Sequence, residues 1–104
     1  MTETPFEVKI SGNVDVTPAL REFVTKKVHH KLGRLSKVNH CHFTIQPNSS
    51  GNYSVKGLVK RDNEQFCHEL VGREVYRIFN ELINNLHEQV TAAFSAKEHL
   101  VKSF

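Results

Sequence analysis

The sequence predicts an α+β fold, a two-layer sandwich in which two helices lie on one face of a four-stranded mixed sheet. Four segments alternate apolar and polar residues, as half-buried strands do, and two segments repeat apolar residues at helical spacing. Their order is β-α-β-β-β-α. Because every strand alternates, only one sheet face is apolar, and both helices are needed to cover it. The 104 residues suffice for one core, so residues 1–104 are predicted to form a single domain.

The first strand is predicted over Pro5–Ile10, where apolar side chains alternate with Glu7 and Lys9. Gly12 and Asn13 then turn the chain. The helix that follows is a crossover, which should bring this strand parallel to the second one. The other three strands form an antiparallel meander, so the predicted sheet order is 1-2-3-4.

The first helix is predicted from Pro18 to about Leu32. Thr17 can cap the first turn, and Pro18 at the first helical position loses only an N–H that would be unpaired there. Gly33 is expected to end the helix in a left-handed conformation. One side of the helix is apolar and faces the sheet, with residues at steps of three and four: Leu20, Phe23, Val24 and Val28.

The meander is predicted over Val38–Gln46, Tyr53–Arg61 and about Gln65–Val71. Residues 47–52 form a loop on composition, and Asp62–Asn63 suits a two-residue hairpin because both residue types tolerate positive φ. The inward positions of its first two strands are Cys41, Phe43, Ile45, Tyr53, Val55, Gly57 and Val59.

The register of the last strand is ambiguous from the pattern alone. Phe66 and Leu70 share one face, and Cys67 and Val71 share the other. We expect Phe66 and Leu70 to point inward, because they bury more apolar surface. The opposite face of the sheet should be wet. It is predicted to carry Glu7, Lys9, His40, His42, Lys56, Lys60 and Glu69.

The second helix begins at about Arg73 or Glu74 and carries the strongest helical period in the chain. Thirty residues of helix span about 45 Å, whereas an eight-residue strand spans roughly 26 Å. The end of the helix should therefore extend past the sheet. Residues 95–104, approximately, are either an extended or frayed tail or part of a homodimer contact. That contact would use Phe94, Leu100, Val101 and Phe104.

Composition and charge narrow the class of protein. No apolar run approaches the roughly 20 residues that cross a membrane, and the N-terminal residues lack the order of a secretory signal, so we expect a cytoplasmic protein. In that compartment Cys41 and Cys67 should be free thiols. Fourteen basic against 11 acidic residues, a net charge of +3, is compatible with a polyanionic partner without establishing one.

Neither a metal site nor an enzyme is predicted. His40 and His42 share a strand face, but the seven histidines offer no HxxxH or CxxC spacing and no set of four ligands. Cys41 should be buried and protonated, and Cys67 has no obvious base or orienting carboxylate. The five glycines are scattered singly, so there is no phosphate-binding loop and no cofactor is expected.

Positive charge gathers on the first helix and its exit, at Arg21, Lys26, Lys27, Lys31, Arg34 and Lys37. Such a cluster can bind phosphates without reading bases. It can equally be an ordinary solvated helix face, because the stems of Lys27 and Lys31 can cover apolar neighbours. The residues alone leave both readings open.

Two motifs resemble a known family. The segment Val16–Val24, followed by a basic helix and a meander, and the segment Glu74–Tyr76 leading into Asn80–Asn84 are similar to the short bacterial ribosome hibernation promoting factors and the ribosome-associated translation inhibitor, the sigma-54 modulation protein family. The resemblance covers nearly the whole chain, to about Val90. It implies the same fold and binding in the small ribosomal subunit, where messenger and transfer RNA would lie, with inhibition of translation in stressed or stationary cells.

One departure from that family concerns the second helix. Family members usually carry lysines and arginines along its exposed side, which contact ribosomal RNA phosphates. The matching stretch here reads Asn85, His87, Glu88, Thr91, Ala92, Ser95 and Ala96. Arg73 and Arg77 remain at its start, so RNA binding is expected to depend mainly on the first helix. The alternative is a family-like domain with weakened RNA binding that acts as a protein–protein module or homodimer.

Overall fold

The computed structural model has the predicted order β-α-β-β-β-α. It describes residues 7–12, 15–33, 35, 38–61 and 63–102, and side chains within residues 8–93. Its elements are β1 (Glu7–Gly12), α1 (Pro18–Lys31), β2 (Val38–Pro47), the short 3-10 turn η1 (Ser49–Gly51), β3 (Tyr53–Arg61), β4 (Glu64–Gly72) and α2 (Val75–Lys102).

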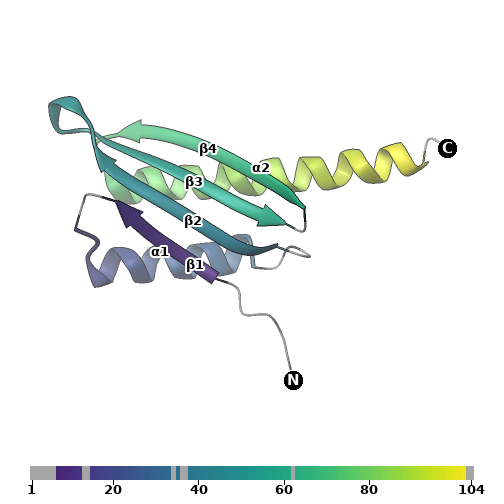
Figure 1. The fold of residues 1–104 in the computed structure, drawn as a ribbon, viewed down its shortest axis with the longest axis horizontal. Helices are drawn as coiled ribbons and strands as arrows, with labels where there is room; N and C mark the ends of the chain where they lie inside the picture. Colours follow the sequence, from purple (N-terminus) through teal and green to yellow (C-terminus); the bar gives the residue numbers. More distant parts are fainter. Residues whose placement is uncertain (1–6, 13–14, 34, 36–37, 62, 103–104) are drawn as a thin grey trace, which may run out of the picture.

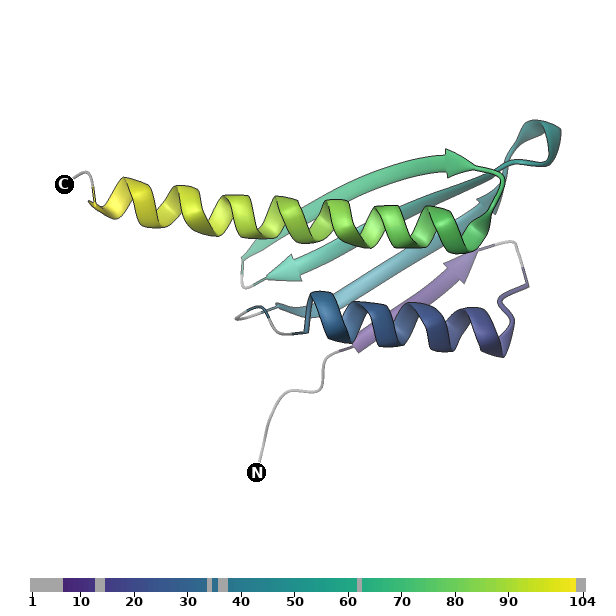
Figure 2. The same cartoon turned by 180° about the vertical axis from the view of Figure 1, so that it is seen from behind.

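The sheet has the predicted order β1-β2-β3-β4 (Figure 1). The strands β1 and β2 are parallel, and β2, β3 and β4 are antiparallel neighbours. Both helices cover the same face of the sheet and leave the other face open (Figure 2). This arrangement confirms the two-layer α+β sandwich, and it follows from the alternation of each strand, which makes only one face apolar.

The core lies between the sheet and the two helices. Phe43 of β2 and Phe79 of α2 meet edge to face at its centre, with ring centroids 5.5 Å apart. At Gly57 of β3 the layers approach closely, because an added Cβ would lie 2.8 Å from Leu86 Cδ1 and 3.0 Å from Phe43 Cε1. The largest fully buried side chains are Phe43, Phe79, Leu32, Ile45, Leu82, Ile83, Leu86, Val24, Val28, Val55, Val59 and Val90.

The helix α1 starts at Pro18 as predicted and ends within a residue of the predicted position, but the conformation expected for Gly33 is wrong. Thr17 Oγ1 accepts a hydrogen bond from the Leu20 N–H at 3.1 Å. Gly33 is not left-handed, since positive φ among the described glycines occurs at Gly12 and Gly51. The last turn closes instead on one carbonyl, because the N–H groups of Leu32 and Gly33 both donate to Val28 O. A side chain at Gly33 would crowd the carbonyl oxygen of His29, 2.7 Å from the added Cβ.

The first strand ends two residues later than predicted. It continues to Gly12, which pairs with Ile45 of β2 and was expected in the turn. Gly12 has φ of 136°, and a Cβ there would overlap the Ile45 carbonyl. Only glycine can therefore pair with Ile45 at the end of this strand. Pro5 and Phe6, at the predicted start, lie outside the described residues.

The strand β4 resolves the ambiguous register as expected. Phe66 and Leu70 pack against the core, whereas Val71 points to the open face and is 54 % exposed. The hairpin before it is closed by Arg61, the buried charged residue of the described chain, whose Nη2 donates to Glu64 Oε1 at 2.9 Å. The prediction that two residues connect β3 and β4 is confirmed by the strand bounds.

The helix α2 extends well beyond the sheet (Figure 2). The side chains of the predicted dimer contact, Phe94, Leu100, Val101 and Phe104, lie outside those that the structure describes. Among the described residues, no helix combines the length and apolar character needed to span a membrane.

Candidate nucleic-acid interface

The exposed side of α1 carries two of the predicted cations, Arg21 and Lys26. Lys26 Nζ lies 2.9 Å from Glu22 Oε1, one turn earlier on the same side. The hydrogen bond and positive charge of Lys26 lower the pKa of the Glu22 carboxyl below its usual value. Both side chains are in solvent, so the pair is weak and screened by salt. A phosphate can therefore take the place of the carboxylate.

Two other cations of α1, Lys27 and Lys31, are half buried. They lie beside the apolar side of the helix, where their methylene stems can cover neighbours while the ammonium groups stay wet. Such packing was one of the two interpretations of these lysines that the sequence left open. It leaves the ammonium groups accessible to a ligand. Arg34 and Lys37 fall outside the described residues.

The remaining predicted cations, Arg73 and Arg77, stand at the entrance to α2. Both are exposed. Arg77 Nε lies 3.9 Å from Glu81 Oε1, a loose pair. The two arginines share a shallow hollow of about 470 Å³ with Glu74 and Glu81. Two carboxylates thus balance the two guanidinium groups, and the hollow has no excess positive charge.

The two helices touch near their first turns. The rings of Phe23 and Tyr76 meet edge to face with centroids 5.0 Å apart. Lys27 follows Phe23 by one helical turn, and Arg77 directly follows Tyr76, so cations of both helices flank this contact. The structure therefore joins α1 and the start of α2 into one helical surface.

After Arg77, the side chains of α2 that the structure describes do not continue a basic surface. Its exposed charged residues after Arg77 are Glu81 and Glu88, within the described side chains. Asn85, expected on the exposed side, instead faces β4, where its Nδ2 lies 3.3 Å from His68 Nε2. Gln89 likewise reaches β4 and donates to the Cys67 carbonyl at 3.5 Å. The described part of α2 thus lacks the basic residues expected from the family resemblance and carries acidic residues on its exposed side.

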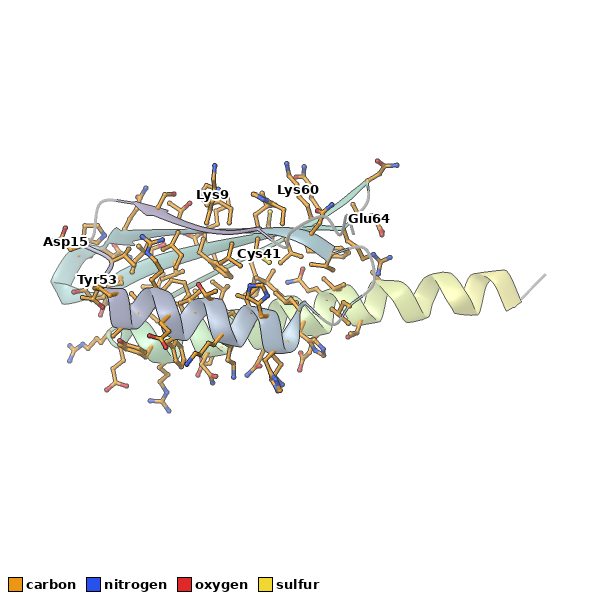
Figure 3. All side chains as sticks on the ribbon, turned by 90° about the horizontal axis from the view of Figure 1, so that it is seen from below. Lys9, Asp15, Cys41, Tyr53, Lys60 and Glu64 are labelled. Atoms are coloured by element: carbon orange, nitrogen blue, oxygen red, sulfur yellow. The ribbon has the colours of Figure 1, made fainter. Side chains whose placement is uncertain are left out.

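A second group of cations lies on the open face of the sheet. Lys9, Lys56 and Lys60 are all exposed, and no carboxylate of the described residues lies within 4.0 Å of them. Lys9 and Lys60 point away from the helices (Figure 3). The sequence places them on this face through strand alternation but does not assign them to an interface. The pairing of β1 with β2 and of β2 with β3 brings these lysines together, and a prediction of that pairing would have identified the group.

The two cysteines differ in their surroundings. Cys41 is buried in the core, and its burial raises the pKa of the thiol to about 12. Cys67 is exposed on the opposite face of the sheet, so the two cysteines cannot pair and both are free. Within the described residues, no three His, Cys, Asp or Glu side chains gather closely enough to hold a metal ion.

Comparison with known proteins bears on the whole domain. The family model of the sigma 54 modulation protein / S30EA ribosomal protein family matches residues 8–94. No curated protein sequence matches the chain significantly.

Solved structures with the same fold include two whose names refer to related proteins. A ribosomal subunit interface protein from Coxiella burnetii superposes with a TM-score of 0.77 at 22 % identity, over 85 % of this chain and 97 % of that one. The N-terminal domain of Protein Y from Thermus thermophilus superposes with a TM-score of 0.70 at 19 % identity, over 79 % of this chain and 91 % of that one.

Proposed function

Because the chain belongs to the sigma 54 modulation protein / S30EA ribosomal protein family, we propose that it is a ribosome-associated factor of stressed or stationary cells. It binds the small ribosomal subunit in the channel for messenger and transfer RNA and so inhibits translation. It is cytoplasmic, and it acts by occupying space, without catalysis or a cofactor. The observation that carries this proposal is the family match, which spans the sheet and both helices up to residue 94.

The helical surface is the proposed contact with ribosomal RNA. Its exposed guanidinium and ammonium groups suit phosphate oxygens, which give affinity and orientation without reading base sequence. Glu81 and Glu88 would repel phosphates further along α2. The contact should therefore centre on α1 and the start of α2. The residues proposed to bind RNA are Arg21, Lys26, Lys27, Lys31, Arg34, Lys37, Arg73 and Arg77.

Co-sedimentation of the full chain with purified small subunits over a salt series tests this proposal. We expect a bound fraction that falls steeply as salt rises, because each phosphate contact releases a counterion. Replacing Arg21, Lys26 and Arg73 with alanine should weaken binding and flatten the salt dependence. The replacement Glu88→Gln is a control that changes charge away from these cations. Absence of a bound fraction at low salt would remove the proposal.

The acidic outer side of α2 favours a second candidate, a protein–protein module that forms homodimers. The part of α2 beyond the sheet supplies a free helical segment for such a contact (Figure 2). The test is the solution mass of the full chain compared with a chain that ends at Phe94. A dimeric full chain and a monomeric shortened chain would support it, and two monomers would exclude it.

A further inference from the structure

We propose that the open face of the sheet is a second RNA-binding surface, which takes a single-stranded segment. This goes beyond the helical contact, because the two surfaces lie on opposite layers of the molecule (Figure 3). The protein would thus be held between two RNA segments. The open-face site consists of Lys9, His40, His42, Lys56 and Lys60.

The three lysines form a triangle on this face. Lys56 and Lys60 lie four residues apart on β3, which separates their backbones by about 13 Å. Lys9 lies two strands away in the row of His42 and Leu58, midway between them. With strands roughly 4.8 Å apart, its distance from each is about 12 Å. The flexible side chains can bring three ammonium groups to successive phosphates of one extended strand.

The acidic residues of this face leave a positive excess. Glu69 lies opposite Lys56 in the register, and its carboxylate accepts a hydrogen bond from Ser54 Oγ at 2.6 Å. Glu7 pairs in register with His40 at the start of β1. Three lysines against two glutamates still favour a polyanion here. By contrast, the outer side of α2 after Arg77 has only acidic charges among its described side chains.

Two imidazoles lie between the lysines and suit the bases of a single strand. His40 and His42 stand on the central strand β2, with ring centroids 6.4 Å apart and planes at 68°. His42 Nε2 is 2.8 Å from Ser11 Oγ, which fixes the position of that ring. Histidine rings on an open sheet can stack unpaired bases, while lysines hold the phosphates. A duplex hides its base faces and cannot use them.

An ordinary solvated sheet face is the competing explanation, since antiparallel sheets often expose one polar face. On such a face lysines commonly lie beside carboxylates across the strands. Here Glu69 does lie across from Lys56, but no carboxylate of the described residues forms an ion pair with any of the three lysines, and two aromatic rings lie among them. That combination of charge and stacking surface points to RNA.

Cys67 offers a local test, because it is the exposed cysteine and lies on the same face, in the row of Leu58 and His42. We would measure the alkylation rate of Cys67 by N-ethylmaleimide in the full chain with and without saturating 12-nucleotide oligouridylate. Buried Cys41 is the internal control for unfolding. We expect at least fivefold slower alkylation with the oligonucleotide, and a much smaller effect with an RNA duplex of equal length.

Two sets of variants separate this face from the helical surface. Replacing Lys9, Lys56 and Lys60 with alanine should abolish the protection of Cys67, lower affinity about tenfold or more at 0.1 M salt and reduce the salt slope by about two. Glu69→Gln should strengthen binding severalfold. The control Glu88→Gln, with the same change in net charge, should leave Cys67 protection unchanged.

Unchanged alkylation at saturating oligonucleotide would overturn the proposal, as would protection that survives the triple lysine variant. Equal protection by the duplex would overturn the assignment to single strands. These outcomes are independent of whether the protein binds ribosomes. Loss of ribosome binding with intact Cys67 protection would count against the proposed function alone.

Discussion

Glu22 limits how strongly the basic surface of α1 can attract phosphate. Its carboxylate holds Lys26 at 2.9 Å and has a pKa lowered from 4.5 by that neighbour. The pair is therefore intact at neutral pH, and what it contributes to stability is lost as the pH falls through the folded pKa. Because the carboxylate competes with phosphate, we expect Glu22→Gln to tighten ribosome binding about two- to fivefold at low salt.

Co-sedimentation of Glu22→Gln beside the wild type measures this effect. Glu88→Gln is the matched control, since it removes one negative charge from α2 without touching Lys26. Equal tightening by both variants would mean that only net charge matters, and the role given to the ion pair would be wrong.

Cys41 should make the fold sensitive to alkaline pH. Burial raises the pKa of its thiol to about 12 from an ordinary value of 9.0, so the unfolded chain loses this proton at lower pH than the folded one. The stability is fully present below pH 9 and falls by roughly 1.4 kcal/mol per pH unit above it, until the folded pKa.

Urea unfolding of the wild type and Cys41→Ala at pH 8 and pH 10 tests this dependence. The variant will be less stable at pH 8 because it leaves a cavity. The difference between the two proteins should shrink by about 1 kcal/mol at pH 10. A constant difference would contradict the role of this thiol.

At the level of the elements, the contact of α2 with β3 depends on Gly57. A methyl group there would meet Leu86 and Phe43 at 2.8 and 3.0 Å, so the side chains between the layers would have to move. We expect Gly57→Ala to lower the free energy of unfolding by about 1–3 kcal/mol. For a domain of this size that corresponds to roughly 4–8 °C in Tm per kcal/mol.

The comparison variant is Gly72→Ala at the end of β4, where the nearest atom to an added Cβ is Ile78 Cγ1 at 3.2 Å. A smaller loss is expected there, since a single side chain has to shift. Thermal unfolding of both variants measures the difference. An unchanged or higher Tm for Gly57→Ala would show that the layers adapt freely.

The elements themselves were largely predictable from the sequence. Period-two and helical spacing identify the side that each strand and helix buries, and the apolar size of Phe66 and Leu70 decides the register of β4. The backbone conformations at the end of β1 and at the end of α1 were not predictable. The role of Gly12 depends on the carbonyl of Ile45, which only the assembled fold brings close, and that of Gly33 depends on the carbonyl of His29, one turn earlier in α1.

The candidate site was predictable in part, for a related reason. The cations of α1 are neighbours in sequence and stand out in a linear reading. Lys9 and Lys60 are 51 positions apart in the chain, and only the strand register brings them onto one face. On α2 the sequence was misleading. Asn85 was expected on the exposed side of the helix, but its side chain contacts His68 of β4.

For the whole molecule, the charge distribution distinguishes the two layers. The helical surface carries cations mixed with carboxylates, at Lys26 with Glu22 and Arg77 with Glu81. The open-face site carries lysines without ion pairs among the described residues. A molecule with positive surfaces on both sides of a thin sandwich can be held in a channel by RNA from two directions, which a single basic surface cannot achieve.

This geometry predicts that the two surfaces contribute independently to ribosome binding. The substitutions to alanine of Arg21, Lys26 and Arg73 on one layer and of the open-face lysines on the other share no contact, so their free-energy losses should add within about 0.5 kcal/mol. Their reductions in salt slope should add as well. The affinity for small subunits would be measured for each set of substitutions and for the combined variant, which completes a double-mutant cycle. Circular dichroism checks that each variant is folded. A combined loss no larger than the greater single loss would mean that one RNA contact requires both layers, and the two-sided arrangement would have to be given up.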